Sequence, residues 1–199
     1  MIASDPVVLI AAGGRNERWG VPGIKVLAEV DGEPLVGRTV RMCRERKREP
    51  RAVSGHGDVL DAVDGAGYSQ PWSGSVSAMM ADCADLWSGE RVALLLGDVW
   101  YVDGTLSAAL DYRGLLVRAW GSDQEVYAVA WAPGMTATMM VALATAAGHG
   151  GKLWHLLRVL DGLYPTSHAR LPSMLQLVDD GTRDFDSREQ FDAWTAGRF

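Results

Sequence analysis

The residues best suited to chemistry lie in the first 25 positions, directly after an apolar run. Residues 7 to 12 are all apolar, and Gly13 and Gly14 follow them. Two glycines let the backbone turn with positive φ and approach a ligand without a Cβ in the way. The residues that follow include three basic side chains, Arg15, Arg18 and Lys25. Backbone N–H groups beside cationic side chains suit phosphate oxygens, so we expect a nucleotide to bind here.

The spacing of these glycines matches neither of two common phosphate-binding motifs. The P-loop needs a second glycine five positions after the first, and Trp19 stands there when the count starts at Gly14. The dinucleotide fingerprint needs glycines at its third and sixth positions, which are Asn16 and Trp19. On this stretch alone, an ordinary strand, turn and helix with a solvated basic loop stays open as an alternative.

A carboxylate follows a second apolar run in the middle of the chain. Residues 92 to 96 are apolar, and Gly97 and Asp98 come directly after them. Ligands of open α/β sheets bind outside the carboxyl ends of the strands. A carboxylate beside a flexible glycine at such a place can hold a hard divalent cation that bridges phosphates. The alternative is that Asp98 caps the loop or the next helix.

Two further aspartates precede the last helix that the sequence predicts. Asp184 and Asp186 alternate around Phe185, so both carboxylates face the same side of an extended chain. Ser187 and Gln190 form a capping-box pattern for the closing helix. Asp186 could bind a metal together with Asp184, or it could favour the N-terminus of that helix electrostatically.

These stretches resemble the signature of nucleotidyltransferases that load sugar phosphates and related small molecules with a nucleotide. That signature runs A-G-G-x-G-[TS]-R, then P-K, then G-x-P-L. The matching residues here are Ala12-Gly13-Gly14-Arg15-Asn16-Glu17-Arg18, then Pro22-Gly23-Ile24-Lys25, then Gly32-Glu33-Pro34-Leu35. Asn16 replaces a glycine, and two residues separate Pro22 from Lys25. Gly97-Asp98 and Asp184-Phe185-Asp186 resemble the later motifs of the same group, in the right order.

The resemblance implies a fold and a reaction. The fold is glycosyltransferase-A-like, a single three-layer α/β/α domain over residues 1–199 with a mostly parallel, mixed central sheet. The reaction is attack by a phosphate oxygen of an acceptor on the α-phosphorus of a nucleoside triphosphate, with Mg²⁺ as cofactor and release of pyrophosphate. Such a transfer depends mainly on positioning and charge neutralisation, so the absence of an evident His or Ser nucleophile is expected.

The resemblance also implies roles for individual residues. The catalytic residues would be Arg18, Lys25 and Asp98. Arg18 would lie against the β- and γ-phosphates, and Lys25 would meet the charge that develops on the α-phosphate. The nucleotide would contact Ala11, Ala12, Gly13, Gly14, Arg15, Asn16, Arg18, Lys25 and Gly97. Asp98 and Asp184 would hold Mg²⁺, and Asp186 is a lesser candidate for the same role.

Other functions of the same fold stay open at this point. A glycosyltransferase would use a nucleotide-sugar, but such enzymes usually present D-x-D where this chain has Asp98-Val99-Trp100. A non-catalytic nucleotide-binding domain is compatible with Asn16 and with the altered spacing before Lys25. Glu125 is a candidate near the acceptor, with edge-strand solubility as its alternative. A sugar phosphate is the expected acceptor, while the base and the oligomeric state have no readable signal.

The composition excludes several classes of protein. A net charge of −6 and a pI near 5.2 argue against sequence-independent nucleic-acid binding, which needs a basic surface. A hydrophobic content of 48% with 22% charged residues is ordinary for a globular chain. The longest apolar runs are too short to span a bilayer. Cys43 and Cys83 lie in amphipathic patterns, so we expect reduced core cysteines in a cytoplasmic protein.

Alternating strand and helix patterns place these motifs. We expect strands over residues 7–12, 26–30, 51–54, 91–96, 115–118, 125–131 and 175–178. We expect helices over residues 35–47, 75–87, 105–112, 136–147 and 152–160, and a closing helix after Ser187. His56 would lie in an exposed turn, because a lone histidine in a loop is more often exposed than bound to a ligand.

Overall fold

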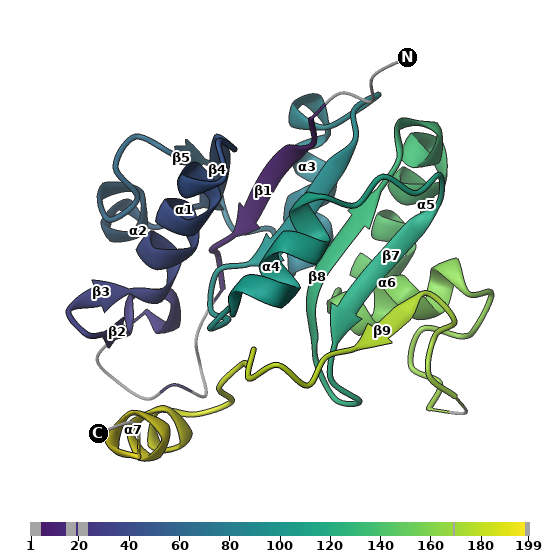
Figure 1. Cartoon of the computed structure of the whole chain (residues 1–199). Helices are drawn as coiled ribbons and strands as arrows, with labels where there is room; N and C mark the ends of the chain where they lie inside the picture. Colours follow the sequence, from purple (N-terminus) through teal and green to yellow (C-terminus); the bar gives the residue numbers. More distant parts are fainter. Residues whose placement is uncertain (1–4, 15–18, 20–23, 169, 198–199) are drawn as a thin grey trace.

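The fold is built on one twisted seven-stranded sheet with helices on both of its faces (Figure 1). The computed structural model describes residues 5–14, 19, 24–168 and 170–197. The sheet strands are β1 (Val7–Ala11), β4 (Pro50–Ser54), β5 (Gly67–Ser69), β6 (Val92–Leu96), β7 (Val117–Gly121), β8 (Val126–Trp131) and β9 (Leu175–Leu177).

The strand order is β5-β4-β1-β6-β8-β7-β9. β8 runs antiparallel to both of its neighbours, β6 and β7, whereas the other neighbouring strands pair in parallel. The expectation of an α/β fold with a mostly parallel, mixed sheet is therefore confirmed. Because β8 is reversed, its first residues lie at the same end of the sheet as the C-terminal ends of β1 and β6.

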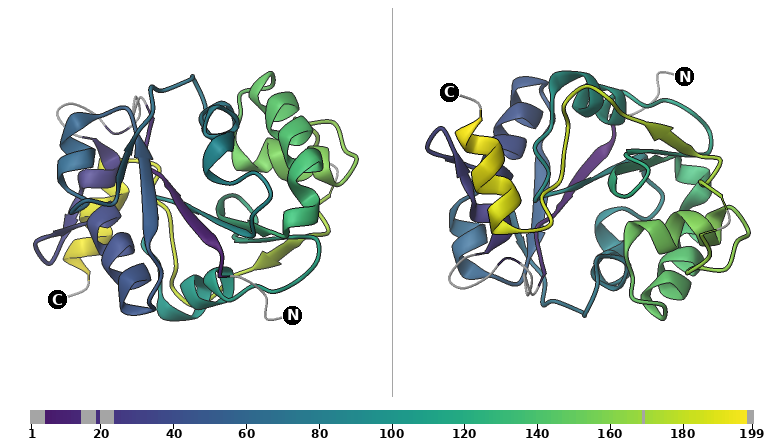
Figure 2. Two further views of the ribbon diagram at one scale, coloured as in Figure 1. Left: turned by 90° about the horizontal axis from the view of Figure 1, so that it is seen from above. Right: turned by 90° about the horizontal axis from the view of Figure 1, so that it is seen from below.

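The helices form a layer on each face of the sheet (Figure 2). One layer contains α1 (Leu35–Glu45), α2 (Gly57–Asp61) and α4 (Asp103–Leu110), and the other contains α3 (Val76–Asp82), α5 (Thr136–Ala147) and α6 (Leu153–Leu160). Successive strand residues point to opposite faces, so Ile10 packs with the first layer and Leu9 with the second. Burial on both faces explains why the central strands are continuous apolar runs.

The C-terminal helix α7 (Arg188–Ala196) lies apart from these two layers, near the small hairpin of β2 (Glu29–Val30) and β3 (Glu33–Pro34) (Figure 1). A third apolar cluster joins Phe191 of α7 with Phe185 and Trp19. The ring centroids of Phe185 and Phe191 lie 5.1 Å apart in an edge-to-face contact. This cluster anchors the chain segment that carries Asp184 and Asp186.

Several expected elements differ from the structure, among them the strand expected over residues 115–118, which is β7 (Val117–Gly121), and the helix expected over residues 105–112, which is α4 (Asp103–Leu110). The strand expected over residues 26–30 is wrong at its start, because Lys25–Leu27 form a 3-10 helix and β2 begins at Glu29. Val26 is buried against the core in this turn, while Lys25 lines the pocket described below. The helix expected over residues 75–87 ends at Asp82, and a 3-10 turn over Ala84–Leu86 follows.

Two smaller expectations concern the cysteines and the membrane. Cys43 and Cys83 are both buried and free, as expected from their place in the apolar patterns. Among the residues that the structure describes, no helix is long and apolar enough to cross a membrane.

Candidate active site

The glycine loop after β1 is shaped by close packing. A Cβ on Gly13 would lie 2.8 Å from the Trp72 ring and 2.9 Å from the Met79 sulfur, so only glycine fits there. Gly14 has a φ of +147°, a conformation that side-chain-bearing residues rarely adopt. Arg15, Asn16 and Arg18, which we expected to contact the nucleotide, lie outside the described residues.

The end of β4 holds this loop in place. The Ser54 hydroxyl donates a hydrogen bond to the Ala12 carbonyl at 3.1 Å and accepts one from the His56 N–H at 3.1 Å. The Nε2 atom of His56 lies 3.1 Å from the Gly14 carbonyl oxygen. The expectation that His56 is merely exposed is wrong, because its ring is partly buried against the glycine loop.

Lys25 brings the two expected metal ligands together. Its ammonium lies 2.8 Å from Oδ2 of Asp98 and contacts Oδ1 of Asp184. Two oxygens within hydrogen-bonding reach of one nitrogen are at most about 6 Å apart. The carboxylates of Asp98 and Asp184 therefore converge, although they lie far apart in the sequence.

The chain segments that carry these two aspartates are tied by a backbone bridge. The Trp100 N–H donates to the Arg183 carbonyl at 2.8 Å, and the Arg183 N–H donates to the Trp100 carbonyl at 3.0 Å. Gly97 lets β6 end close to β1, because a Cβ there would lie 3.1 Å from the Ala11 carbonyl oxygen. Asp98 and Asp184 thus meet because backbone contacts fix both segments at the same edge of the sheet.

Burial and the neighbouring opposite charges have opposing effects on the pKa values of Lys25 and Asp184, which lie together with Asp98. Burial alone lowers the pKa of the Lys25 ammonium, but the adjacent Asp98 and Asp184 carboxylates outweigh burial and raise that pKa above its ordinary value. Burial, helped by the negative charge of Asp98, raises the pKa of Asp184 to about 7, while Lys25 opposes this rise. The site therefore holds more negative charge than one lysine fully offsets.

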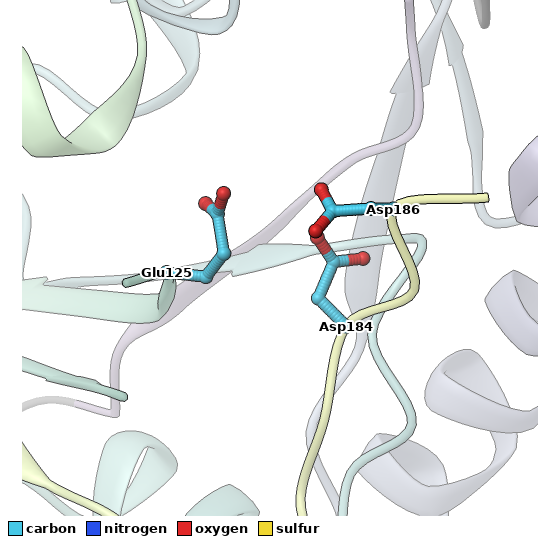
Figure 3. A group of neighbouring side chains, drawn as sticks. All are labelled: Glu125, Asp184 and Asp186. Carbon is cyan, nitrogen blue, oxygen red and sulfur yellow. The ribbon is translucent and has the colours of Figure 1, made fainter. Parts of the chain in front are cut away.

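A second group of carboxylates overlaps this trio (Figure 3). Oxygen atoms of Glu125, Asp184 and Asp186 all lie within 4.8 Å of one another, so the three side chains could hold a metal ion. Glu125 directly precedes β8, and the reversed direction of β8 brings it to the edge where β6 ends. Burial raises the pKa of Glu125, and the charge of Lys152 opposes this rise.

A cavity of about 650 Å³ connects these features. Gly13, Gly14, Lys25, Asp98 and Asp184 line one part of it, and Trp72 lies beside the glycine loop. The lining also includes Glu125, Val126, Gly150, Lys152, Leu153 and Trp154. The cavity thus presents a glycine loop, two lysines and four carboxylates to a ligand, a combination suited to phosphate groups and a hard cation.

Comparisons with known proteins identify the family and the fold of this chain. The sequence matches the model of the MobA-like NTP transferase domain over residues 8–185. The CTP:phosphocholine cytidylyltransferase of Streptococcus pneumoniae has a similar structure, with a TM-score of 0.67, 10% identity, and coverage of 98% of this chain and 100% of that one. A putative glucose-1-phosphate thymidylyltransferase from Bacillus anthracis gives a TM-score of 0.70 at 12% identity, covering 96% and 94%. A comparison with curated proteins found no significant match.

The fold and the family match together define an enzyme of the nucleotidyltransferase class, as the sequence motifs predicted. Within that class, the chain belongs to the family of MobA-like NTP transferase domains, whose model covers most of its length. The solved structures share less than a fifth of their residues with this chain, so they establish the fold and no particular substrate.

Proposed function

We propose that this enzyme moves a nucleoside monophosphate from a nucleoside triphosphate to a phosphorylated small-molecule acceptor, in a reaction that requires Mg²⁺. The observation that carries the proposal is the convergence of Lys25, Asp98 and Asp184 beside the glycine loop, in one cavity of about 650 Å³. A cavity of this size accommodates a nucleotide together with part of a second substrate.

In this proposal, the glycine loop binds the triphosphate. Gly13 and Gly14 allow phosphate oxygens to approach backbone N–H groups closely, and Arg18 stays a proposed partner of the β- and γ-phosphates. Lys25 would contact the α-phosphate, where negative charge develops during transfer. For Lys25 to contact the α-phosphate, its ammonium would have to leave the carboxylates of Asp98 and Asp184.

The residues present fit a divalent cation. Asp98, Asp184, Asp186 and Glu125 offer only carboxylate oxygens, which are the ligands that Mg²⁺ prefers. The Lys25 ammonium already lies against two of these carboxylates, so their oxygens are placed to surround a positive charge. A bound Mg²⁺ would neutralise phosphate charge and orient the triphosphate.

The acceptor would bind in the part of the cavity that Glu125 and Lys152 line. Lys152 is exposed there and can meet an anionic group, while the Glu125 carboxylate can accept a hydrogen bond from a hydroxyl or an amino group. A phosphate oxygen of the acceptor forms the new bond to the α-phosphorus, and the bond from that phosphorus to the bridging oxygen of pyrophosphate breaks. A phosphate is ionised near neutral pH, so this step needs no general base.

The names of the similar structures support a phosphorylated acceptor. They describe transfer to phosphocholine and to glucose 1-phosphate. We therefore propose a small phosphate monoester, with sugar phosphates as the first class to test.

The test is a matrix of the four nucleoside triphosphates against a panel of sugar phosphates and phosphocholine, with Mg²⁺, monitored by pyrophosphate release. We expect one combination to release pyrophosphate, and Lys25→Met to abolish this release. Release of a free nucleoside diphosphate from a nucleotide-sugar, with no pyrophosphate from any triphosphate, would favour a glycosyltransferase instead.

A variant at the acceptor side gives a second test. Lys152→Met should raise KM for the acceptor about tenfold or more and leave KM for the triphosphate within about twofold, because one charged hydrogen bond contributes roughly 1.5–3 kcal/mol. Lys47→Met is the matched control, since Lys47 is exposed after α1 and does not line the cavity. Equal effects of Lys152→Met on both KM values would contradict this placement of the acceptor.

A further inference from the structure

We propose that Lys25 keeps divalent metal out of the site until a nucleoside triphosphate arrives, so that metal and nucleotide enter together. This inference rests on the proposed function, because it concerns the same carboxylates. It adds an order to the binding steps, and it assigns to Lys25 a second role besides contact with the α-phosphate.

The contacts of Lys25 conflict with metal binding at the same oxygens. The Lys25 side chain is only 12% exposed, and its ammonium contacts Asp98 Oδ2 at 2.8 Å and Asp184 Oδ1. These carboxylates are the ones proposed to hold Mg²⁺. An ammonium and a metal ion cannot occupy the same place between two oxygens, so one has to leave before the other can bind.

The charges explain why metal alone does not displace Lys25. The ammonium and the two carboxylates leave one net negative charge in a site with limited access to water. A dication placed between the same two carboxylates would lie directly beside the Lys25 ammonium, and two cations repel each other across a short distance in a weakly screening environment. The other carboxylates of the described lining, Glu125 and Asp186, are themselves candidates for the metal, so without another anion Lys25 has no partner outside the metal site to which it could move.

A triphosphate changes both conditions. Its phosphates bring several negative charges, which offset the added metal, and their oxygens complete the coordination of Mg²⁺. Its α-phosphate also offers Lys25 a new anionic partner. Metal and nucleotide should therefore increase each other's affinity, and this coupling is reciprocal by thermodynamic necessity.

The experiment measures binding of Mn²⁺, a paramagnetic substitute for Mg²⁺, to protein without nucleotide, from the loss of the free-ion resonance signal. We expect weak binding to the unsubstituted protein and at least tenfold tighter binding to Lys25→Met. Lys47→Met, which makes the same change in net charge away from the cavity, should bind like the unsubstituted protein. Lys25→Arg, which keeps a cation between the aspartates, should also bind weakly.

Further variants locate the effect. Adding Asp184→Asn to Lys25→Met should abolish the gain, because it removes a shared carboxylate. Lys25→Gln is a second neutral variant in case Lys25→Met does not fold, as judged by circular dichroism. If neither folds, the unsubstituted protein decides: the proposal stands if it binds Mn²⁺ weakly alone and its nucleotide complex binds Mn²⁺ at least a hundredfold more tightly than the free nucleotide does.

The proposal is overturned if the unsubstituted protein binds Mn²⁺ as tightly as Lys25→Met, or if Lys47→Met gives the same gain. It is also overturned if the gain survives Asp184→Asn. None of these measurements requires turnover. Absence of pyrophosphate release would therefore refute the proposed reaction without deciding this inference, and tight metal binding to the free protein would refute the inference without touching the reaction.

Discussion

Gly13 is a residue whose identity is set by its neighbours. The space that a Cβ would need is already taken by the Trp72 ring and the Met79 sulfur. Gly13→Ala should therefore lower the free energy of unfolding by about 1–3 kcal/mol, as expected for overpacking, and weaken nucleotide binding. Urea denaturation and nucleotide titration would measure the two effects.

Gly57→Ala is the control for that substitution, because a Cβ at Gly57 meets no atom within 4 Å. Replacing Trp72 by leucine in the Gly13→Ala background should restore part of the lost stability. If Gly13→Ala and Gly57→Ala proved equally stable, the tight packing of the glycine loop would be wrong.

Asp184 should make the stability of the metal-free protein depend on pH. Burial and the charge of Asp98 raise its pKa from 3.8 to about 7, so the folded state retains a proton that the unfolded state has lost. A raised carboxyl pKa makes stability fall as pH rises between about 4 and 7. Asp184→Asn should therefore be more stable relative to the unsubstituted protein at pH 8 than at pH 5, by roughly 2–4 kcal/mol.

Urea denaturation at both pH values, in the presence of a chelator, would measure this difference. Asp186→Asn, at an exposed neighbouring position, controls for the change of side chain itself. A difference between Asp184→Asn and the unsubstituted protein that is the same at pH 5 and pH 8 would contradict the raised pKa. The two aspartates do not face each other alone, since Lys25 lies between them.

At the scale of elements, the start of α7 positions the Asp184 segment. The Ser187 hydroxyl accepts a hydrogen bond from the Gln190 N–H at 3.2 Å, as the capping-box pattern predicted. The Gln190 side chain accepts from the Asp186 N–H at 2.9 Å, one residue earlier than in the standard motif. The cap thus fixes the backbone of Asp186, one residue of the carboxylate cluster, as well as the start of α7.

Ser187→Ala should cost about 1 kcal/mol of stability, the typical effect of losing an N-cap. It should also weaken metal binding in the presence of nucleotide, because the backbone of Asp186 loses part of its support. Thr195→Ser, near the other end of α7, is a conservative control that retains the hydroxyl. If Ser187→Ala left the metal affinity unchanged, the N-cap of α7 would have no role in positioning the metal ligands.

Most elements could be predicted because their apolar patterns reflect burial. The buried strands β1 and β6 and the helix over Thr136–Ala147 follow directly from such patterns. The place of Glu125 at the site could not be predicted in this way, because an apolar run predicts a buried strand but not whether that strand is parallel or antiparallel to its neighbours. Because β8 runs antiparallel to β6, it is the N-terminal end of β8 that lies at the active site.

The contacts between distant residues were also out of reach of local patterns. The resemblance to nucleotidyltransferases indicated Asp98 and Asp184 as joint ligands of Mg²⁺, but their shared contact with Lys25 depends on the side-chain geometry of three segments. His56 gave no signal, since its role rests on a single contact with the backbone of Gly14. The sequence thus indicated the two glycines, Lys25 and the carboxylates that line the cavity, but not Trp72, Lys152 or Trp154, nor how the charged groups neutralise each other.

At the scale of the whole molecule, stability should be uneven. β1, β6 and β8 are paired on both sides and buried on both faces. The segment over residues 179–187 belongs to no strand of the sheet and is held by the bridge to Trp100, the Lys25–Asp184 contact, side-chain hydrogen bonds such as those from Thr105 to Asp180, and the aromatic cluster of α7. Hydrogen exchange should therefore be slowest in those three strands and several orders of magnitude faster over residues 179–190. A nucleotide with Mg²⁺ should slow exchange in that segment more than in the strands. Equal protection of both regions without ligand would contradict this prediction.

The bridge between Trp100 and Arg183 has a consequence for how the enzyme is made. Asp98 and the glycine loop leave the ribosome well before Asp184, which lies 86 residues after Asp98 in the chain. A nascent chain can therefore form β1, β4 and β6 while one carboxylate of the site does not yet exist. Completion of the site therefore waits for synthesis of the segment after β9, and a product that terminates before Arg183 lacks Asp184 however well its sheet folds.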